Sequence, residues 1–279
     1  MITEHTVARD DSIYQAFPDV ALTAGGKLVC VYAEMTHHRN RDYTRVMLTD
    51  SSDRGRTWAT PRPLSKPTSY DNDPLDWYNC PRLSTLSDGR LVALVDYCVR
   101  YKPGTPESHV EGRTQHLFIS DDEGATWAGP TELDIRGIVP DQITELKLGD
   151  HVGRWIFATH HKTLPDRETW RVEAWISDDQ GGTWSEPFTI AEQPPLQLCE
   201  PTIVELPEGQ LACFMREHTG DSQDCHKCIS IDGGRTWTDP VRFPIPACHR
   251  PVAAVLNSGK LLITFRLMQG GNGWVGWWT

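Results

Sequence analysis

The chain has 279 residues, with 27 basic and 38 acidic side chains and a formal net charge of −11. No block of like charge interrupts this acidic balance, which argues against nucleic acid and anionic membrane surfaces as partners. No apolar run approaches the roughly 18 residues of a membrane helix, and the first residues lack the apolar stretch of a signal peptide. We therefore expect a cytoplasmic protein without membrane insertion, or a secreted one if a leader has been removed.

Short apolar runs bounded by glycine, proline and aspartate follow one another along the whole chain, and no helical periodicity of useful length is present. An all-β fold is therefore predicted, and the eight cysteines are too few for a disulfide scaffold in a chain of this length. The clearest strand candidates are KLVCVYAE (27–34), RLVALVDYC (90–98), RWIFATHH (154–161), QLACFMRE (210–217) and KLLITFR (260–266).

A repeated hairpin signal accompanies these strands. A proline stands eight positions before a glycine that ends a turn, and an apolar strand follows that glycine. The segment DQITELKLGDHVGRWIFATHH (141–161) keeps the hairpin but has a longer turn, which ends at Gly153. The four regular pairs are Pro18 and Gly26, Pro81 and Gly89, Pro201 and Gly209, and Pro251 and Gly259.

A second repeat, S-x-D-x-G-x-T-W, occurs four times: SSDRGRTW (51–58), SDDEGATW (120–127), SDDQGGTW (177–184) and SIDGGRTW (230–237). We interpret it as a turn in which the aspartate binds the local backbone, the glycine supplies a positive φ and the tryptophan packs between strands. A catalytic or calcium-binding role is disfavoured, because identical residues in four separate units cannot all line one site.

One unit has four strands: the two strands of the hairpin, a third strand and, after the turn motif, a fourth strand. Such units arranged around a central axis are typical of a β-propeller. We predict one propeller domain over residues 1–279, with blades at roughly 11–66, 76–135, 139–192 and 198–245 and a partial blade at 247–279.

The four motifs resemble the Asp-boxes, or BNR repeats, of the sialidase superfamily, and the resemblance covers nearly the whole chain. It implies a six-bladed propeller of sialidase type, of which about five blades lie within this sequence. A sixth blade would need roughly 50 further residues, and closure as a five-bladed ring is the alternative. The resemblance does not fix the activity, because Asp-boxes occur in hydrolases, lyases and non-catalytic propellers.

Strand polarity predicts which face of the blades carries the site. The hairpin turns and the Asp-boxes point to one end of each blade, so the start of the first strand and the end of the second point to the other, where a ligand pocket is expected. The histidines concentrate in segments assigned to this face, His38 and His160 among them. Two sets of residues at equivalent positions in the repeats should surround the mouth of this pocket. They are Ala33, Asp96, His160, Arg216 and Arg266, which follow the hairpin glycines, and Phe17, Cys80, Glu200 and Arg250, which precede the prolines.

The resemblance also implies a chemistry in which three arginines hold a substrate carboxylate, a glutamate polarises a tyrosine nucleophile and an aspartate is the acid/base. Glu200 and Arg216 match the glutamate and one arginine, including their spacing. Arg250 and Arg266 compete for another arginine position. Asp42 is the candidate acid/base, and the nucleophilic tyrosine would belong to the sixth blade.

One element of that pattern is missing, because Ala16, Phe17 and Pro18 stand where the family carries Arg-Ile-Pro. We therefore expect a smaller carboxylate clamp. The candidate catalytic residues are Glu200, Asp42 and His160, and the candidate substrate-binding residues are Arg216, Arg250, Arg266, Asp96 and His38.

Neither a cofactor nor a metal is predicted. The CHKC segment (225–228), near His218, resembles half of a metal site, but it falls on a strand, where positions three apart point to opposite faces. No second cysteine pair with zinc-finger spacing is present.

The leading functional hypothesis is a sialidase-like exo-glycosidase that acts on an acidic or modified sugar of a glycan. The first alternative is a polysaccharide lyase or hydrolase for uronate glycans, in which a neutral histidine acts with a tyrosine such as Tyr43 or Tyr78. The second alternative is a non-catalytic glycan-binding propeller, which the missing arginine favours. The sugar, its linkage, the nucleophile and the oligomeric state are left open.

Overall fold

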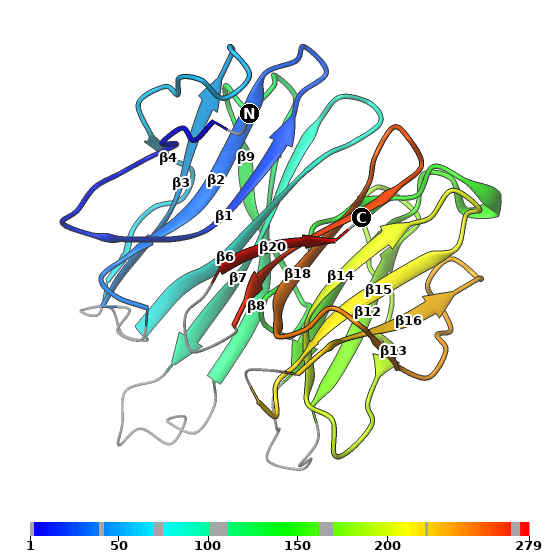
Figure 1. Ribbon diagram of the computed structural model, residues 1–279. Coiled ribbons are helices and arrows are strands. Elements are labelled where there is room, and N and C mark those ends of the chain that lie inside the picture. The colour runs from blue at the N-terminus through cyan, green and yellow to red at the C-terminus, as the bar shows by residue number, and fades with distance from the viewer. Residues whose placement is uncertain are drawn as a thin grey trace. The chain divides into compact units, whose positions relative to one another are not determined.

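The computed structural model describes residues 3–38, 42–69, 75–100, 111–161, 170–220, 223–268 and 274–278. Within these ranges the chain forms twenty strands and one short 3-10 helix, η1 (Gly149–His151), so the predicted all-β class is confirmed. The chain divides into two compact units, Met1–Val139 and Pro140–Thr279. Figure 1 colours the first unit from blue to green and the second from green to red.

The first unit contains two antiparallel sheets in which consecutive strands are neighbours. The first sheet consists of β1 (Tyr14–Leu22), β2 (Leu28–Met35), β3 (Tyr43–Ser51), β4 (Arg62–Pro63) and β5 (Thr68–Ser69), the last two both paired with β3. The second sheet consists of β6 (Leu75–Thr85), β7 (Leu91–Arg100), β8 (Glu111–Ser120) and β9 (Ala128–Leu133).

The second unit contains three sheets of the same kind. The third sheet consists of β10 (Thr144–Glu145), β11 (Trp155–His161), β12 (Arg171–Ser177) and β13 (Phe188–Ala191). The fourth consists of β14 (Leu198–Glu205), β15 (Leu211–Glu217), β16 (Cys225–Ser230) and β17 (Val241–Phe243). The fifth consists of β18 (Cys248–Val255), β19 (Leu261–Leu267) and β20 (Trp274–Trp278). A single domain over the whole chain stays a prediction.

The hairpin turns follow the chemistry predicted for them. Between β6 and β7, the Leu86 N–H donates to the Arg90 carbonyl at 2.9 Å and the Gly89 N–H donates to the Leu86 carbonyl at 3.1 Å. Gly89 has φ +89°, a left-handed conformation that a residue with a Cβ adopts only with strain. The turns between β1 and β2, β14 and β15, and β18 and β19 repeat this pattern of two hydrogen bonds.

The Asp-boxes are hydrogen-bonded turns. In the second sheet, Asp122 Oδ1 accepts the Thr126 N–H at 2.8 Å and Asp122 Oδ2 accepts the Thr126 hydroxyl at 2.6 Å. Hydrogen bonds from the Thr126 hydroxyl and amide and from the Ser120 hydroxyl lower the pKa of Asp122 to about 2. The Trp127 indole N–H donates to the Gly124 carbonyl at 3.1 Å. The interpretation of this aspartate as a turn residue is therefore confirmed.

The core lies between the faces of neighbouring sheets within each unit. In the first unit, β2 and β3 pack against β6, β7 and β8 through side chains such as Val31, Leu48 and Ala93. In the second unit, one cluster joins the third and fourth sheets and another joins the fourth and fifth. Cys228 belongs to the first of these clusters and Cys225 to the second, so the CHKC segment does place its cysteines on opposite faces.

Two features of the described residues bear on membrane and metal binding. None of the described helical segments is long and apolar enough to cross a bilayer. In the same part of the chain, histidine, cysteine and acidic side chains form no group of three or more that could hold a metal ion.

Candidate functional site

The start of the first strand is irregular in four of the five described sheets, and this irregularity positions the candidate site. The pairing register shifts at the X-Pro step of β1, β6, β14 and β18. A β-bulge of this kind bends the strand and redirects a side chain. The residue before the proline is left-handed in four places, although none of them is glycine: Phe17 (φ 56°), Val139 (φ 52°), Glu200 (φ 49°) and Arg250 (φ 52°).

The sequence prediction missed one of these positions. Val139 and Pro140 precede the third sheet, but Pro140 stands 13 positions before Gly153 instead of eight. Most of the difference comes from the longer turn, which contains η1, and one further residue lies between the proline and the turn. The sequence signal for this position was Pro140 itself, followed by the polar residue Asp141. In the structure the Asp141 N–H donates to the Ala158 carbonyl of β11 at 2.8 Å.

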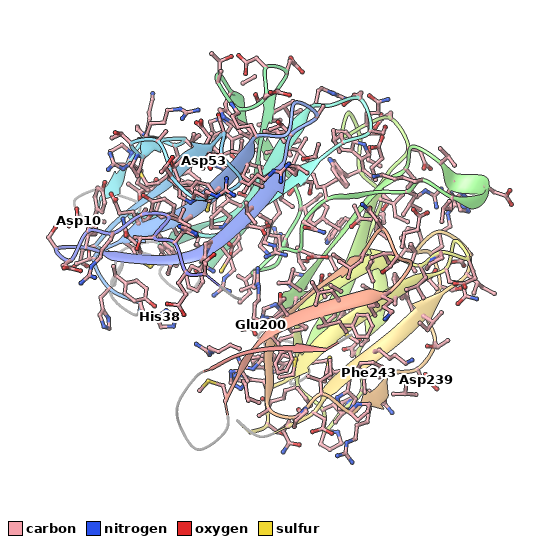
Figure 2. All side chains as sticks on the ribbon, turned by 45° about the horizontal axis from the view of Figure 1, so that its top comes forward. Asp10, His38, Asp53, Glu200, Asp239 and Phe243 are labelled. Atoms are coloured by element: carbon pink, nitrogen blue, oxygen red, sulfur yellow. The ribbon has the colours of Figure 1, made fainter. Side chains whose placement is uncertain are left out.

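Glu200 is the centre of the polar group in the second unit, and Figure 2 labels it. Its Oε1 accepts a hydrogen bond from Arg216 Nη1 at 3.1 Å, and its Oε2 accepts the backbone N–H of Arg250 at 3.0 Å. The Glu200 side chain is 21% exposed, whereas that of Arg216 is 10% exposed. The carboxylate is thus fixed by two partners and still reaches the surface.

His160 contacts the same residue from the third sheet. The Glu200 N–H donates to His160 Nδ1 at 3.3 Å, so Nδ1 is the acceptor and the neutral ring carries its proton on Nε2. The His160 side chain is buried. The structure therefore brings Glu200, Arg216, Arg250 and His160 together in one unit, as the hairpin register predicts.

The two arginines keep donors that no described residue satisfies. Arg250 Nη2 donates to the Pro140 carbonyl at 3.3 Å, but Arg250 Nη1 has no hydrogen-bond partner in the described part of the chain. Arg216 Nε also has no hydrogen-bond partner among the described residues, and both nitrogens are buried. A buried guanidinium N–H without an acceptor is costly, and a carboxylate is the acceptor that matches its geometry.

Arg266 occupies the position in the fifth sheet that Arg216 occupies in the fourth. The residue opposite Arg266 is His249, as the residue opposite Arg216 is Cys199. Arg266 Nη2 lies 3.1 Å from His249 Nδ1, and because arginine only donates, Nδ1 is the acceptor. Arg266 is exposed, and its assignment as a substrate ligand stays a prediction.

An aromatic residue that the sequence did not single out lies beside His160. Trp170, just before β12, is half-buried and stacks with two histidine rings. Its ring centroid lies 6.0 Å from that of His160 and 4.9 Å from that of His218, with interplanar angles of 12° and 26°. No repeat or spacing marks Trp170, because its segment lies outside the Asp-box and hairpin patterns.

The remaining candidates belong to the first unit. The Asp96 carboxylate is fully buried and accepts three hydrogen bonds, from Asn79 Nδ2 at 2.8 Å, the Cys80 N–H at 2.7 Å and the Val139 N–H at 3.1 Å. It therefore holds the backbone of the bulge. Asp42 is half-buried just before β3. Acid/base chemistry at Asp42 and substrate binding at Asp96 both stay predictions.

His38 is exposed and lies near aromatic rings of β1. Its centroid is 5.9 Å from that of Tyr14 and 5.8 Å from that of Phe17, and its role in substrate binding stays a prediction. Tyr43, the first tyrosine of the lyase alternative, donates from its hydroxyl to Glu34 Oε1 at 3.3 Å. Burial raises the pKa of Tyr43.

Tyr78, the second tyrosine of that alternative, contacts a histidine. Its hydroxyl lies 3.2 Å from His116 Nδ1, and His116 is stacked on Tyr97 with centroids 4.2 Å apart. Burial raises the pKa of Tyr78 to about 12 and lowers the pKa of His116. At neutral pH the pair is therefore a neutral phenol beside a neutral imidazole. The Tyr97 hydroxyl donates in turn to Asp76.

Comparison with known proteins places this geometry in context. A family model described as "BNR repeat-like domain" matches residues 26–270. The leech protein "Anhydrosialidase" from Macrobdella decora is 31% identical over 139 residues, which cover 45% of this chain and 16% of the leech protein.

Solved structures give the same picture at the level of the fold. A Dyadobacter fermentans protein of unknown function has a TM-score of 0.74 at 20% identity, over 97% of this chain and 80% of that one. A leech intramolecular trans-sialidase has a TM-score of 0.71 at 14% identity, over 95% of this chain and 58% of that one. In both leech comparisons the chain thus covers less than two thirds of the matched protein. The predicted resemblance to the sialidase superfamily and its β-propeller fold is confirmed, whereas the number of blades stays a prediction.

Proposed function

The chain belongs to the BNR repeat-like domain family, and from this premise we propose that it is a sialidase-type glycosidase that acts on an acidic or modified sugar. The observation that carries the proposal is the group around Glu200, in which a partly exposed carboxylate is held by Arg216 and by the backbone of Arg250. The local identity to the leech anhydrosialidase supports the glycosidase class.

The arginines account for the preference for an acidic sugar. Arg216 and Arg250 lie beside Glu200, and their guanidinium groups supply the positive charge that matches a substrate carboxylate. A clamp of these two arginines is smaller than a set of three. The proposal therefore includes substrates with a carboxylate on a modified sugar and is not limited to one acid.

Glu200 supplies negative charge close to where a glycosidic bond would break. A glycosyl cation-like transition state develops positive charge, which a fixed carboxylate stabilises more strongly than it stabilises the neutral substrate. His160, as a neutral ring with its proton on Nε2, adds a donor without adding charge. Trp170 offers an apolar edge beside the two histidines, which suits the carbon face of a sugar ring.

The test compares variants on fluorogenic glycosides of N-acetylneuraminic acid and of glucuronic acid. Glu200→Gln should lower kcat by roughly 10²–10³ while KM changes little, because it removes transition-state stabilisation. Arg216→Ala should raise KM for both acidic sugars, because the carboxylate loses a fork-shaped partner. Glu208→Gln, in the exposed turn at the opposite end of the same hairpin, is the control and should leave both constants unchanged. Wild-type turnover in both the Glu200 and the Arg216 variant would exclude this group of residues as the active site.

A second function, a uronate lyase, is favoured by the contact between Tyr78 and His116. The neutral imidazole would take the proton from the carbon next to a uronate carboxylate, and the phenol would give a proton to the leaving oxygen. This candidate ranks second because both of its reacting groups are buried, at 6% and 7% exposed, whereas the Glu200 side chain of the first candidate is 21% exposed. An unsaturated, ultraviolet-absorbing product from uronate polymers, lost in Tyr78→Phe, would favour it over hydrolysis. Binding of these glycans without any product would favour the non-catalytic alternative.

A further inference from the structure

Two left-handed residues that precede a proline have their backbone N–H held by the same kind of partner. Before the third sheet, the Val139 N–H donates to Asp96 Oδ2 at 3.1 Å, and in the fourth sheet the Glu200 N–H donates to His160 Nδ1 at 3.3 Å. Each acceptor is the sixth residue of the second strand in the preceding sheet, β7 for Asp96 and β11 for His160. Both acceptors are buried, so they satisfy backbone groups that water does not reach easily.

The second sheet shows what happens where this acceptor is missing. The sixth residue of β2 is Ala33, whose side chain accepts no hydrogen bond. The Cys80 N–H, before the proline of β6, donates instead to Asp96 of its own sheet at 2.7 Å, and Cys80 does not have a positive φ. In the second, third and fourth sheets, the left-handed conformation therefore accompanies an acceptor that the preceding sheet provides.

The fourth sheet uses a pair of side chains for the same purpose. The sixth residue of β15 is Arg216, which donates hydrogen bonds but accepts none. Its Nη1 donates to Glu200 Oε1 at 3.1 Å, and Glu200 Oε2 accepts the N–H of Arg250 in the fifth sheet at 3.0 Å. The contacts thus form a series in which His160 holds the backbone of Glu200, and the carboxylate of Glu200 holds the backbone of Arg250.

The packing of His160 suits it to hold a partner in a fixed place. The residue is 2% exposed, and its ring stacks with that of Trp170 at 6.0 Å and 12°. The buried Val172 lies opposite His160 on β12. A side chain whose rotamer is locked by packing positions its partner more precisely than an exposed one.

We propose that His160 is a positioning residue of the candidate active site, because it fixes the backbone of Glu200 by accepting its N–H. The Glu200 carboxylate can then reach Arg216 and the Arg250 N–H at the same time. The kinetic consequence rests on the proposed glycosidase function, whereas the hydrogen bonds belong to the chain itself. A displacement of about 1 Å at a reacting group can cost about 10²-fold in rate, so loss of the acceptor should lower turnover strongly.

Hydrogen exchange at single amides, followed by NMR, tests the contact without any substrate. His160→Leu removes the acceptor and keeps an apolar side chain in the buried site, whereas His160→Asn keeps an acceptor oxygen close to the place of Nδ1. We expect the Glu200 amide to exchange at least about tenfold faster in His160→Leu, and within about threefold of the wild-type rate in His160→Asn. The Arg250 amide should follow the same order, because Glu200 carries its acceptor. Equal exchange at the Glu200 amide in the wild type and in His160→Leu would overturn the proposal.

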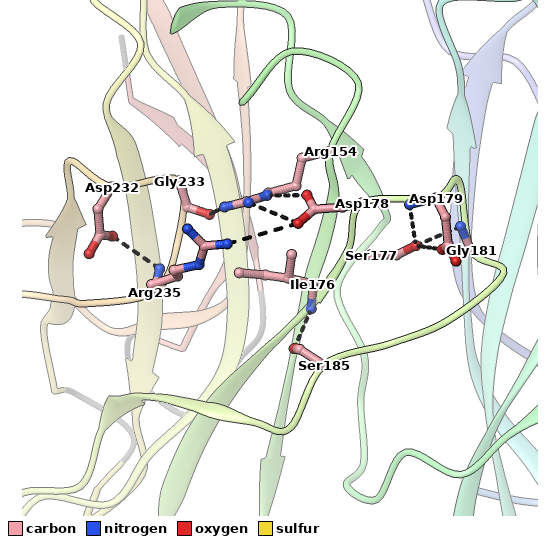
Figure 3. Close-up of polar contacts among 10 residues, drawn as sticks. All are labelled: Arg154, Ile176, Ser177, Asp178, Asp179, Gly181, Ser185, Asp232, Gly233 and Arg235. Carbon is pink, nitrogen blue, oxygen red and sulfur yellow. Dashed lines mark hydrogen bonds and ion pairs between the residues drawn. The ribbon is translucent and has the colours of Figure 1, made fainter. Parts of the chain in front are cut away.

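Arg154 supplies the matched control, because it joins the third and fourth sheets at the other end of β11. It fastens the fourth Asp-box turn by donating from Nη1 to the Gly233 carbonyl at 2.9 Å, as Figure 3 shows. Arg154→Met should lower Tm but leave exchange at the Glu200 amide unchanged. If Arg154→Met accelerates that exchange as much as His160→Leu does, the effect is a general loosening of the two sheets, and the positioning role is wrong.

A double-mutant cycle on a fluorogenic N-acetylneuraminic acid glycoside tests whether His160 acts through Glu200. His160→Leu should lower kcat by roughly 10²-fold in the wild-type background, but by less than about threefold in the Glu200→Gln background. His160→Asn should restore most of the lost turnover. An equal loss in both backgrounds would mean that His160 acts independently of Glu200, which contradicts the proposal. Absence of turnover in the wild-type chain would count against the proposed function alone, because the exchange experiment would still decide the role of His160.

Discussion

Truncation of Trp127 to alanine tests the claim that the Asp-box is a packing device. A buried tryptophan removes roughly 150–250 Å² from water, which at about 25 cal/mol per Å² corresponds to about 4–6 kcal/mol. Trp127 is half-buried, so about half of that applies, and the hydrogen bond to the Gly124 carbonyl adds about 1 kcal/mol. The expected loss in the free energy of unfolding is therefore about 3–4 kcal/mol.

Thermal unfolding followed by circular dichroism is the assay for this loss. For a chain of this length, 1 kcal/mol shifts Tm by roughly 2–4 °C, so Trp127→Ala should lower Tm by roughly 10 °C. Trp127→Phe keeps most of the ring but loses the indole N–H, and it should lower Tm by only about 3 °C. An unchanged Tm in Trp127→Ala, accompanied by loss of glycan binding or turnover, would refute the packing argument.

Three further predictions concern buried polar groups. Asp96→Asn should destabilise the fold by about 2–3 kcal/mol in urea unfolding, because an amide NH₂ would face donors such as the Cys80 N–H. Arg154→Met should lower Tm without changing turnover, because it releases the turn that Arg154 fastens. Burial opposes ionisation of Glu173, but hydrogen bonding and ion pairing with His161 and a neighbouring arginine prevail and lower its pKa. The stability that Glu173 contributes is present at pH values above its ordinary pKa of 4.5, and it is lost as the pH falls through the lowered pKa of the folded state. Glu173→Gln should therefore make Tm depend less on pH in the acid range.

The sequence predicted those parts of the fold that depend on local turn chemistry. A hairpin with a glycine at a fixed place, or an aspartate four residues before a threonine, determines its own hydrogen bonds within a few residues. The strands on either side of these turns therefore begin and end close to where the repeats indicate. The third sheet was harder to read, because its first strand, β10, has only two residues and a longer turn precedes β11.

The candidate site was predictable only as far as pairing within one sheet reaches. Glu200 and Arg216 lie on paired neighbouring strands, so their spacing along the chain implies their contact. The contacts of Glu200 with His160 and with the Arg250 backbone join different sheets, and they depend on how the sheets pack. Trp170 was missed for the same reason, because nothing local to its segment indicates the two histidine rings that it contacts.

The strained residues before the prolines separate what the architecture requires from what the chemistry requires. A left-handed residue other than glycine costs of order 1–3 kcal/mol and often marks a functional site. Here, however, Phe17 and Val139 adopt the same conformation as Glu200 and Arg250. The strain therefore recurs before prolines whatever side chain stands there, and it is not by itself a sign of catalysis. What distinguishes Glu200 and Arg250 is the charged side chain that the bulge carries. The same repeated backbone feature thus presents apolar side chains at Phe17 and Val139 and a carboxylate with a guanidinium in the second unit, which is why the proposed chemistry is assigned to Glu200 and its partners.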